Sequence, residues 1–145
     1  MLLPFQPTPL QYRREPFDHP DFLFELKYDG FRALAVMQFG RALFVSRNGH
    51  PFMSFSSLAE AISADVNVEG RTVLDGEIVY VDRRGRPRFK DLLFHRGNPS
   101  FFAFDLLMLS GKDYRMERLT ERKEEFAAAT GLCSSKLLGQ ICRPC

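Results

Sequence analysis

A lysine and an aspartate stand two residues apart at the end of a short apolar stretch, as Lys27 and Asp29. Partial desolvation at such a position lowers the pKa of a lysine and frees its amine as a nucleophile. Asp29 is placed to orient the amine or to help hold a metal ion, and Gly30 permits close backbone approach. Arg32 carries a planar set of donors that suits a phosphate or a ribose hydroxyl. These residues predict a nucleophilic site, with a solvated hairpin turn as the alternative.

Two carboxylates, Asp75 and Glu77, interrupt an apolar stretch that has the pattern of a strand. Side chains two apart share one face of a strand. Two buried acids are costly unless they bind a cation or hydrogen-bond donors, so the pair predicts a site for Mg²⁺ or a sugar diol. Pairing with Arg32 or Arg47 is the alternative. Arg47 itself follows Ser46 in a turn that suits a phosphate, or it is simply solvated.

Two further segments are candidate functional sites, a phenylalanine-rich stretch and a basic stretch. In a regular strand Phe102 and Phe104 share one face, opposite Asp105, and one ring is available to stack on a base. A plain core strand is the alternative. The basic stretch is a predicted hairpin tip and its flank, suited to DNA phosphates or to solvent. Its residues are Arg83, Arg84, Arg86, Arg88, Lys90 and Arg96.

The elements that must position these residues follow from apolar periodicity and turn signals. Strands are predicted over 22–26, 31–39, 42–46, 73–81 and 100–109, and helices over 56–64, 89–94 and 121–129. Ser56 and Thr120 are expected to cap the helices that they begin, and Gly131 suits the position after the last helix. The order predicts an α+β fold of mainly antiparallel sheets with flanking helices.

Composition limits the class of protein. The 145 residues are 45% hydrophobic, which is enough for one domain with a real core and excludes disorder and coiled coil. Twenty basic and 18 acidic residues leave a formal charge of +2, so nucleic-acid affinity would need local clustering. No stretch is long enough to span a membrane. The three cysteines all lie near the C-terminus, which favours a reducing, cytoplasmic setting.

Taken in order, four segments resemble motifs I, Ia, III and IIIa of the covalent nucleotidyltransferases. The segments are KYDG from Lys27, SRNG from Ser46, LDGEIV from Leu74 and FFAFDLLML from Phe101. The string ELKYDGFRALAV is most similar to ATP-dependent DNA ligases of the bacterial end-joining type. The resemblance covers roughly residues 4–131. It implies an ATP-grasp-like adenylation domain, partial over 1–131, with residues 132–145 unassigned.

The resemblance also implies roles. Lys27 would attack the α-phosphate of ATP to form lysyl-AMP, with Mg²⁺ bridging phosphate oxygens. Glu25 would lie near the adenine amino group and Phe104 on the adenine ring. Arg32 and Glu77 would contact the ribose and a phosphate. The remaining nucleotide and supporting residues would be Arg47, Asp29 and Asp75, and Arg84, Arg86 and Arg88 are the candidate DNA contacts.

In the family, AMP then passes to a 5′-phosphate of nicked or broken double-stranded DNA, and a 3′-hydroxyl displaces it. This chemistry would serve DNA repair, recombination and replication, with end-joining proteins as possible partners. An RNA ligase or capping-type nucleotidyltransferase is the alternative among enzymes.

The sequence departs from the family after the last predicted helix. The E-G-x-V and K-x-K strands of motifs IV and V are not found, and Lys136 stands alone there. Cys133, Cys142 and Cys145 match no common zinc module, although a zinc site with a distant histidine is an alternative. A truncation or an altered reading frame is therefore expected. The chain is expected to seal nicks poorly, and a catalytically impaired ATP- or DNA-binding fragment is a further alternative.

Overall fold

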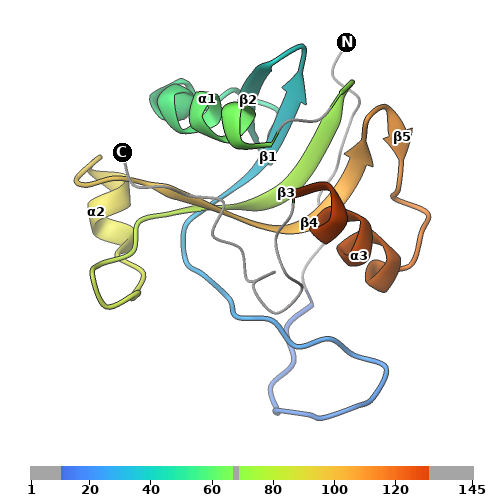
Figure 1. Ribbon diagram of the computed structural model, residues 1–145. Helices are drawn as coiled ribbons and strands as arrows, with labels where there is room; N and C mark the ends of the chain where they lie inside the picture. Colours follow the sequence, from blue (N-terminus) through green and yellow to red (C-terminus); the bar gives the residue numbers. More distant parts are fainter. Residues whose placement is uncertain (1–10, 67–68, 131–145) are drawn as a thin grey trace.

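A computed structural model of the chain describes residues 11–66 and 69–130. Within them, five strands form an antiparallel sheet in the spatial order β2-β1-β3-β4-β5 (Figure 1). The predicted α+β fold with a mainly antiparallel sheet is confirmed. The strands are β1 (Phe31–Gln38), β2 (Arg41–Ser46), β3 (Thr72–Val79), β4 (Ser100–Leu109) and β5 (Lys112–Asp113).

The helices lie between and after the strands. They are the 3₁₀ turn η1 (Met53–Phe55), α1 (Ser56–Asp65), α2 (Phe89–Leu93) and α3 (Leu119–Thr130). The predicted caps are wrong at two positions. No side-chain cap bond is seen at the start of α1, because η1 runs directly into it and Ser56 is already helical. Thr120 lies inside α3, which begins one residue earlier at Leu119.

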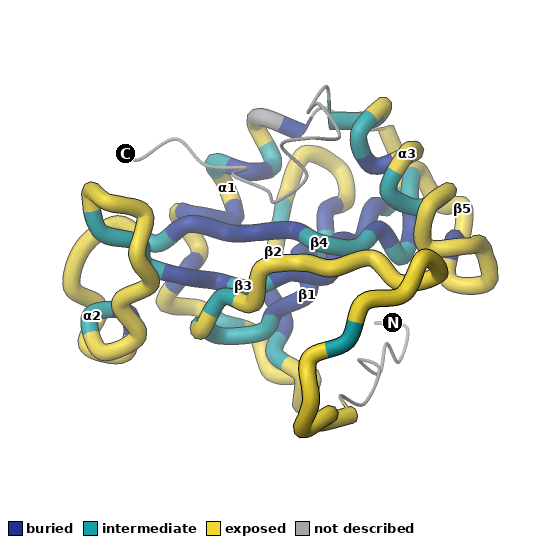
Figure 2. Tube along the Cα trace, turned by 90° about the horizontal axis from the view of Figure 1, so that it is seen from below, coloured by how far each residue is buried: buried dark blue, intermediate teal, exposed yellow. Residues whose placement is uncertain are grey.

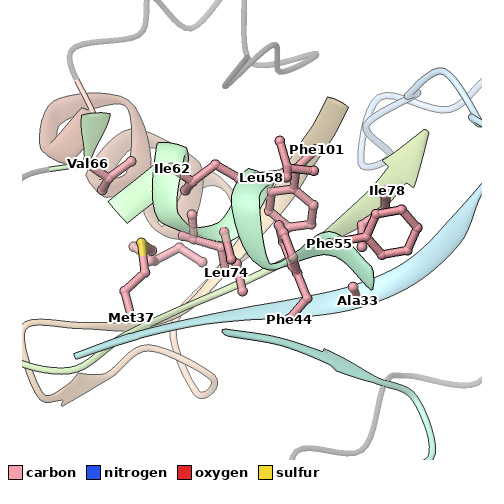
Figure 3. Packing of buried hydrophobic residues seen from close by; sticks show 14 of the residues in the cluster. Ala33, Met37, Phe44, Phe55, Leu58, Ile62, Val66, Leu74, Ile78 and Phe101 are labelled. Carbon is pink, nitrogen blue, oxygen red and sulfur yellow. The ribbon is translucent and has the colours of Figure 1, made fainter. Parts of the chain in front are cut away.

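The core lies between one face of the sheet and α1. Alternate residues of β1 point toward this core, as the period of two predicts, and small ones such as Ala33 and Ala35 make room for the helix. Leu58 and Ile62 of α1 face the sheet, as Figure 3 shows. The rings of Phe44 and Phe101 meet there with centroids 4.8 Å apart. Burial of each large side chain stabilises the fold by about 1.5–3 kcal/mol.

The first predicted strand, 22–26, is not formed. Residues 22–29 have no regular secondary structure, and the segment runs along the outside of the molecule as the exposed tube before β1 in Figure 2. The side chains of Phe22, Leu23, Phe24 and Leu26 are all more than half exposed. A strand needs a neighbour for its backbone groups, and none of the described strands pairs with this segment. The predicted Asp29–Gly30 hairpin is therefore absent as well.

An irregularity between β3 and β4 changes which side chains share a face. Gly76 pairs with Ala103 but Asp75 pairs with Asp105, so Phe104 is an extra residue in β4. A β-bulge of this kind redirects the side chains that follow it. The prediction that Asp105 lies opposite Phe102 is wrong for this reason, since both now lie on the face that carries Asp75. None of the helices described is long and apolar enough to cross a membrane.

Candidate active site

Seven of the predicted site residues line one large cavity on the sheet face opposite α1. Its volume is about 1010 Å³, at the upper end of the range typical of small-molecule sites. Four segments that are far apart in the sequence contribute to it: the loop before β1 with the start of β1, the turn after β2, β3 and β4. The predicted residues that line it are Glu25, Lys27, Asp29, Arg32, Arg47, Glu77 and Phe104. Asp75 lies beneath, where Arg32 covers it.

Lys27 is exposed and carries its proton firmly. Its ammonium group pairs with the Asp29 carboxylate, and the two side chains are 78% and 72% exposed. The hydrogen bond and the charge of Asp29 raise the pKa of Lys27, and the more distant Glu77 carboxylate adds to this. The expectation that desolvation lowers this pKa is therefore wrong for the free protein. The expected strand before Lys27, which would have buried it, does not form.

Arg32 and Asp75 form a bidentate ion pair across β1 and β3. The guanidinium donates from Nε to Oδ1 at 3.1 Å and from Nη2 to Oδ2 at 2.7 Å. The Asp75 side chain is 6% exposed and that of Arg32 is 26% exposed, so one edge of the guanidinium still reaches the cavity. The pairing raises the pKa of Arg32. Of the two interpretations left open for Asp75, arginine pairing is the one that the structure shows.

Glu77 links β3 to the loop that carries Lys27. Its Oε1 accepts a hydrogen bond from the backbone N–H of Gly30 at 3.0 Å. Glycine is required at position 30, because an added Cβ would lie 2.1 Å from the carbonyl oxygen of Ile78. Burial raises the pKa of Glu77, against the opposing effects of the Gly30 N–H and the charges of Lys27 and Arg32.

Aromatic rings form the wall of the cavity on β4. Phe104 is partly exposed, and the Arg32 guanidinium lies 5.2 Å from its ring centroid. The ring of Tyr28 stacks on Phe102, with centroids 4.3 Å apart and planes 23° apart. The stack holds the segment between Lys27 and Asp29 against β4. The sequence drew attention to Phe102 through its face but gave no signal for its pairing with Tyr28.

Two basic residues of α3 bond to residues at or next to the cavity wall and were not among the predicted site residues. Arg122 donates to both oxygens of Asp105, at 2.7 and 2.9 Å. Lys123 pairs with the carboxylate of Glu25 and donates to the carbonyl oxygen of Phe104 at 2.9 Å. The available signal was two adjacent basic residues on a short helix, which by itself is typical of a solvated surface.

Arg47 stands at the cavity rim in an ordered turn. The backbone N–H of Gly49 donates to the carbonyl of Ser46 at 2.9 Å, and the Ser46 hydroxyl accepts from the N–H of His50 at 3.1 Å. Gly49 adopts a φ of 81°, which favours glycine. The turn leaves the Arg47 side chain exposed beside the cavity.

The basic hairpin tip lies outside this cavity. The carboxylate of Asp82 accepts from the backbone N–H groups of Arg84 and Arg86 at 2.9 and 3.1 Å, and also from the Arg86 side chain. These bonds lower the pKa of Asp82 and give the tip a defined shape. Arg88 pairs with Asp91 at 3.1 Å. Two of the three candidate DNA contacts are thus engaged in local ion pairs.

The candidate metal ligands of the site are carboxylates. Among residues 11–66 and 69–130, no three His, Cys, Asp or Glu side chains are clustered to hold a metal ion by themselves. Mg²⁺ in phosphate-transfer sites usually needs only one or two carboxylates beside the substrate phosphates. Asp29 and Glu77 line the cavity and are the candidates for this role, whereas Arg32 covers both oxygens of Asp75. Gly131 and the cysteines, with the whole of 131–145, lie outside the described residues.

Comparison with known proteins connects this geometry to a family. The chain is 34% identical over 113 residues to the multifunctional non-homologous end joining protein LigD of Pseudomonas aeruginosa, covering 74% of this chain and 13% of that protein. It is 32% identical to DNA ligase C of Mycobacterium tuberculosis, covering 90% of this chain and 40% of that protein. The chain therefore spans well under half the length of these relatives.

Solved structures agree with the sequence comparison. The ligase domain of M. tuberculosis LigD superposes with a TM-score of 0.57 at 33% identity, covering 73% of this chain and 37% of that one. A mycobacterial DNA ligase D complexed with ATP and MES gives a TM-score of 0.57 at 32% identity, covering 73% and 36%. The profile of the "ATP dependent DNA ligase domain" family matches residues 10–134. The chain, with its lysine, arginine and carboxylates around one cavity, belongs to this family of ATP-dependent DNA ligase domains.

Proposed function

We propose that the chain forms a covalent lysyl-AMP intermediate from ATP, as the first step of DNA end joining or nick sealing. The single observation that carries the proposal is the convergence of Lys27, Arg32, Glu77 and Phe104 on one cavity. An adenine nucleotide needs an aromatic face for the base, polar groups for the ribose, and cations for the phosphates. The cavity offers each of these, and an exposed amine beside them.

The step itself is a phosphoryl-type transfer. The neutral amine of Lys27 attacks the α-phosphorus of ATP, so that an N–P bond forms while the P–O bond to the β-phosphate breaks. Pyrophosphate leaves with the electron pair, and the nitrogen releases its proton. Alignment of the reacting groups and neutralisation of charge carry most of the catalysis in reactions of this kind.

Each side chain has a role in this proposal. Arg32 and Glu77 hold the ribose and the adjacent phosphate, and Asp75 fixes the orientation of Arg32. Phe104 stacks on the adenine ring, Glu25 accepts from its amino group, and Arg47 binds a phosphate at the rim. Asp29 and Glu77 would hold Mg²⁺, which supplies charge neutralisation on the phosphate oxygens when it is bound.

AMP would then pass to the 5′-phosphate of nicked or broken duplex DNA, from which a 3′-hydroxyl displaces it. The relatives named for end joining support DNA as the substrate. The domain would span residues 1–131, with 132–145 as a separate tail. The hairpin tip with Arg84, Arg86 and Arg88 would contact DNA phosphates.

Incubation of the chain with α-labelled ATP and Mg²⁺ tests the proposal. We expect a covalent label that is stable to denaturation and is released by acid, as an N–P bond is. Lys27→Ala should abolish the label because it removes the nucleophile. Lys112→Ala, at an exposed lysine of β5 outside the cavity, is the matched control and should label like the wild type.

The outcomes separate the proposal from its competitors. Wild-type chain that takes no label contradicts lysyl-AMP formation and favours a binding module. Label from GTP in preference to ATP favours a capping-type enzyme. Sealing of a nicked duplex is measured separately, and we expect it to be slow, because the sequence holds no K-x-K pair for the α-phosphate.

A further inference from the structure

One ammonium group joins two segments that are far apart in the sequence. Both segments are expected to contact the adenine. Lys123 of α3 pairs with the carboxylate of Glu25, 98 residues away, and donates to the carbonyl oxygen of Phe104 at 2.9 Å. Its side chain is 14% exposed and that of Glu25 is 37% exposed. A lysine held this tightly is unusual, because lysine side chains normally remain in solvent.

The cation itself is held in place by its neighbours. The adjacent Arg122 attaches α3 to β4 through both oxygens of Asp105, and its Nη1 donates to the carbonyl of Glu117 at 2.7 Å. Phe126, one turn further along α3, is buried in the core. α3 therefore presents Lys123 from a rigid base.

Glu25 lies in a segment that none of the described strands pairs with. It belongs to the exposed segment without regular structure that precedes β1, so no strand ladder holds its backbone. Within the described part of the chain, the hydrogen bond of the Glu25 carboxylate is the one that it accepts from Lys123. Where Glu25 points is thus decided by α3 rather than by the segment that contains it.

We infer that Lys123 is a positioning residue of the adenine subsite, which sets the distance between the Glu25 carboxylate and the Phe104 ring. The inference rests on the proposed function of this cavity. A fixed carboxylate accepts a hydrogen bond from the 6-amino group of adenine but repels the 6-oxo group of guanine. Lys123 should therefore influence the choice of ATP over GTP without touching either nucleotide.

Calorimetric titration of the intact chain with ATP and with GTP tests the inference. In Lys123→Met we expect ATP affinity to fall about tenfold, as for loss of one charge-assisted hydrogen bond. The preference for ATP over GTP should narrow by a similar factor. Lys123→Arg should restore most of both, and Lys112→Met, at an exposed lysine of β5, should change neither.

A double-mutant cycle separates positioning from general stability. If Lys123 acts through Glu25, then Lys123→Met should add little to the loss already caused by Glu25→Gln. Glu25→Gln alters an exposed segment and leaves the core intact, so it can be measured even if Lys123→Met fails to fold.

The results are distinguishable. Wild-type chain that binds ATP, with an unchanged ATP-to-GTP ratio in Lys123→Met or fully additive losses in the cycle, overturns the positioning role alone. An unchanged ratio in Glu25→Gln overturns it too. Wild-type chain that does not bind ATP overturns the proposed function and the inference with it.

Discussion

Lys27 holds its proton more tightly than an isolated lysine, because Asp29 beside it stabilises the ammonium form. A nucleophilic amine must be neutral, so in the proposed reaction this pairing would hold back attack by Lys27 in the free protein. In the proposed reaction, the same carboxylate would be drawn to a metal ion. Lys27 would then lose the partner that raises its pKa, and the amine would become available only when nucleotide and metal are present.

The pKa of Lys27 gives a prediction at this scale. Replacement of Asp29 by Asn removes both the charge and the strong acceptor, so the pKa of Lys27 should fall and its neutral fraction at a given pH should rise. The measurement is the pH dependence of acylation at Lys27 by an amine reagent without nucleotide, followed by mass spectrometry. We expect the rising limb to move to lower pH, while Lys112 in the same sample serves as the internal control. An unmoved midpoint would show that Asp29 does not govern this pKa.

At the scale of elements, β3 and β4 decide how the site face is built. The close approach at Gly76, where an added Cβ would lie 2.4 Å from the carbonyl oxygen of Phe102, allows the strands to meet at the bulge. The extra residue Phe104 brings Asp105 onto the face of Asp75. Each of these two carboxylates is neutralised by its own arginine, from β1 and α3 respectively.

Glu77 of β3 carries its carboxyl group on this face at some cost in stability. Its folded-state pKa is raised, chiefly by burial. A carboxyl with a raised pKa favours folding fully below its unfolded pKa, and this contribution is lost as the pH rises through the folded value. At neutral pH, where this contribution is lost, the charge of the Glu77 carboxylate therefore disfavours folding.

Glu77→Gln should accordingly raise the resistance of the chain to urea at pH 7, because it removes the partly buried charge and keeps an acceptor for the Gly30 N–H. The difference from wild type should shrink at about pH 3.5, where the wild-type carboxyl is protonated as well. Urea midpoints at the two pH values check this. A lower midpoint at pH 7 would mean that the attractions to Lys27 and Arg32 outweigh the burial of the charge.

For the molecule as a whole, the net charge is small and the positive charge is concentrated in local clusters. The net charge of +2 gives little general attraction to DNA. The hairpin tip concentrates arginines on a loop that Asp82 shapes through backbone hydrogen bonds. Affinity for DNA phosphates would therefore depend on this tip and on salt.

Neutralisation of the tip tests this dependence. Arg84→Gln with Arg86→Gln should weaken binding to a short duplex and reduce the slope of log affinity against log salt by roughly 2, about 0.9 for each phosphate that an arginine no longer neutralises. The backbone donors to Asp82 remain, so the loop should keep its shape. Arg41→Gln, at an exposed arginine where β2 begins, is the matched control. An identical salt slope in the double variant would show that the arginines of the tip are solvated and do not contact DNA phosphates.

The sequence by itself determined where the strands β1 to β4 lie and the order of the site segments, because both depend on neighbouring residues and local apolar patterns. Only the tertiary structure decided three other features. They are the sheet face on which Asp105 lies, the absence of a strand over 22–26, and the ion pair between Lys123 and Glu25. A bulge depends on how a second strand pairs, and a strand depends on a partner for its backbone. An ion pair across 98 residues has no local signal at all.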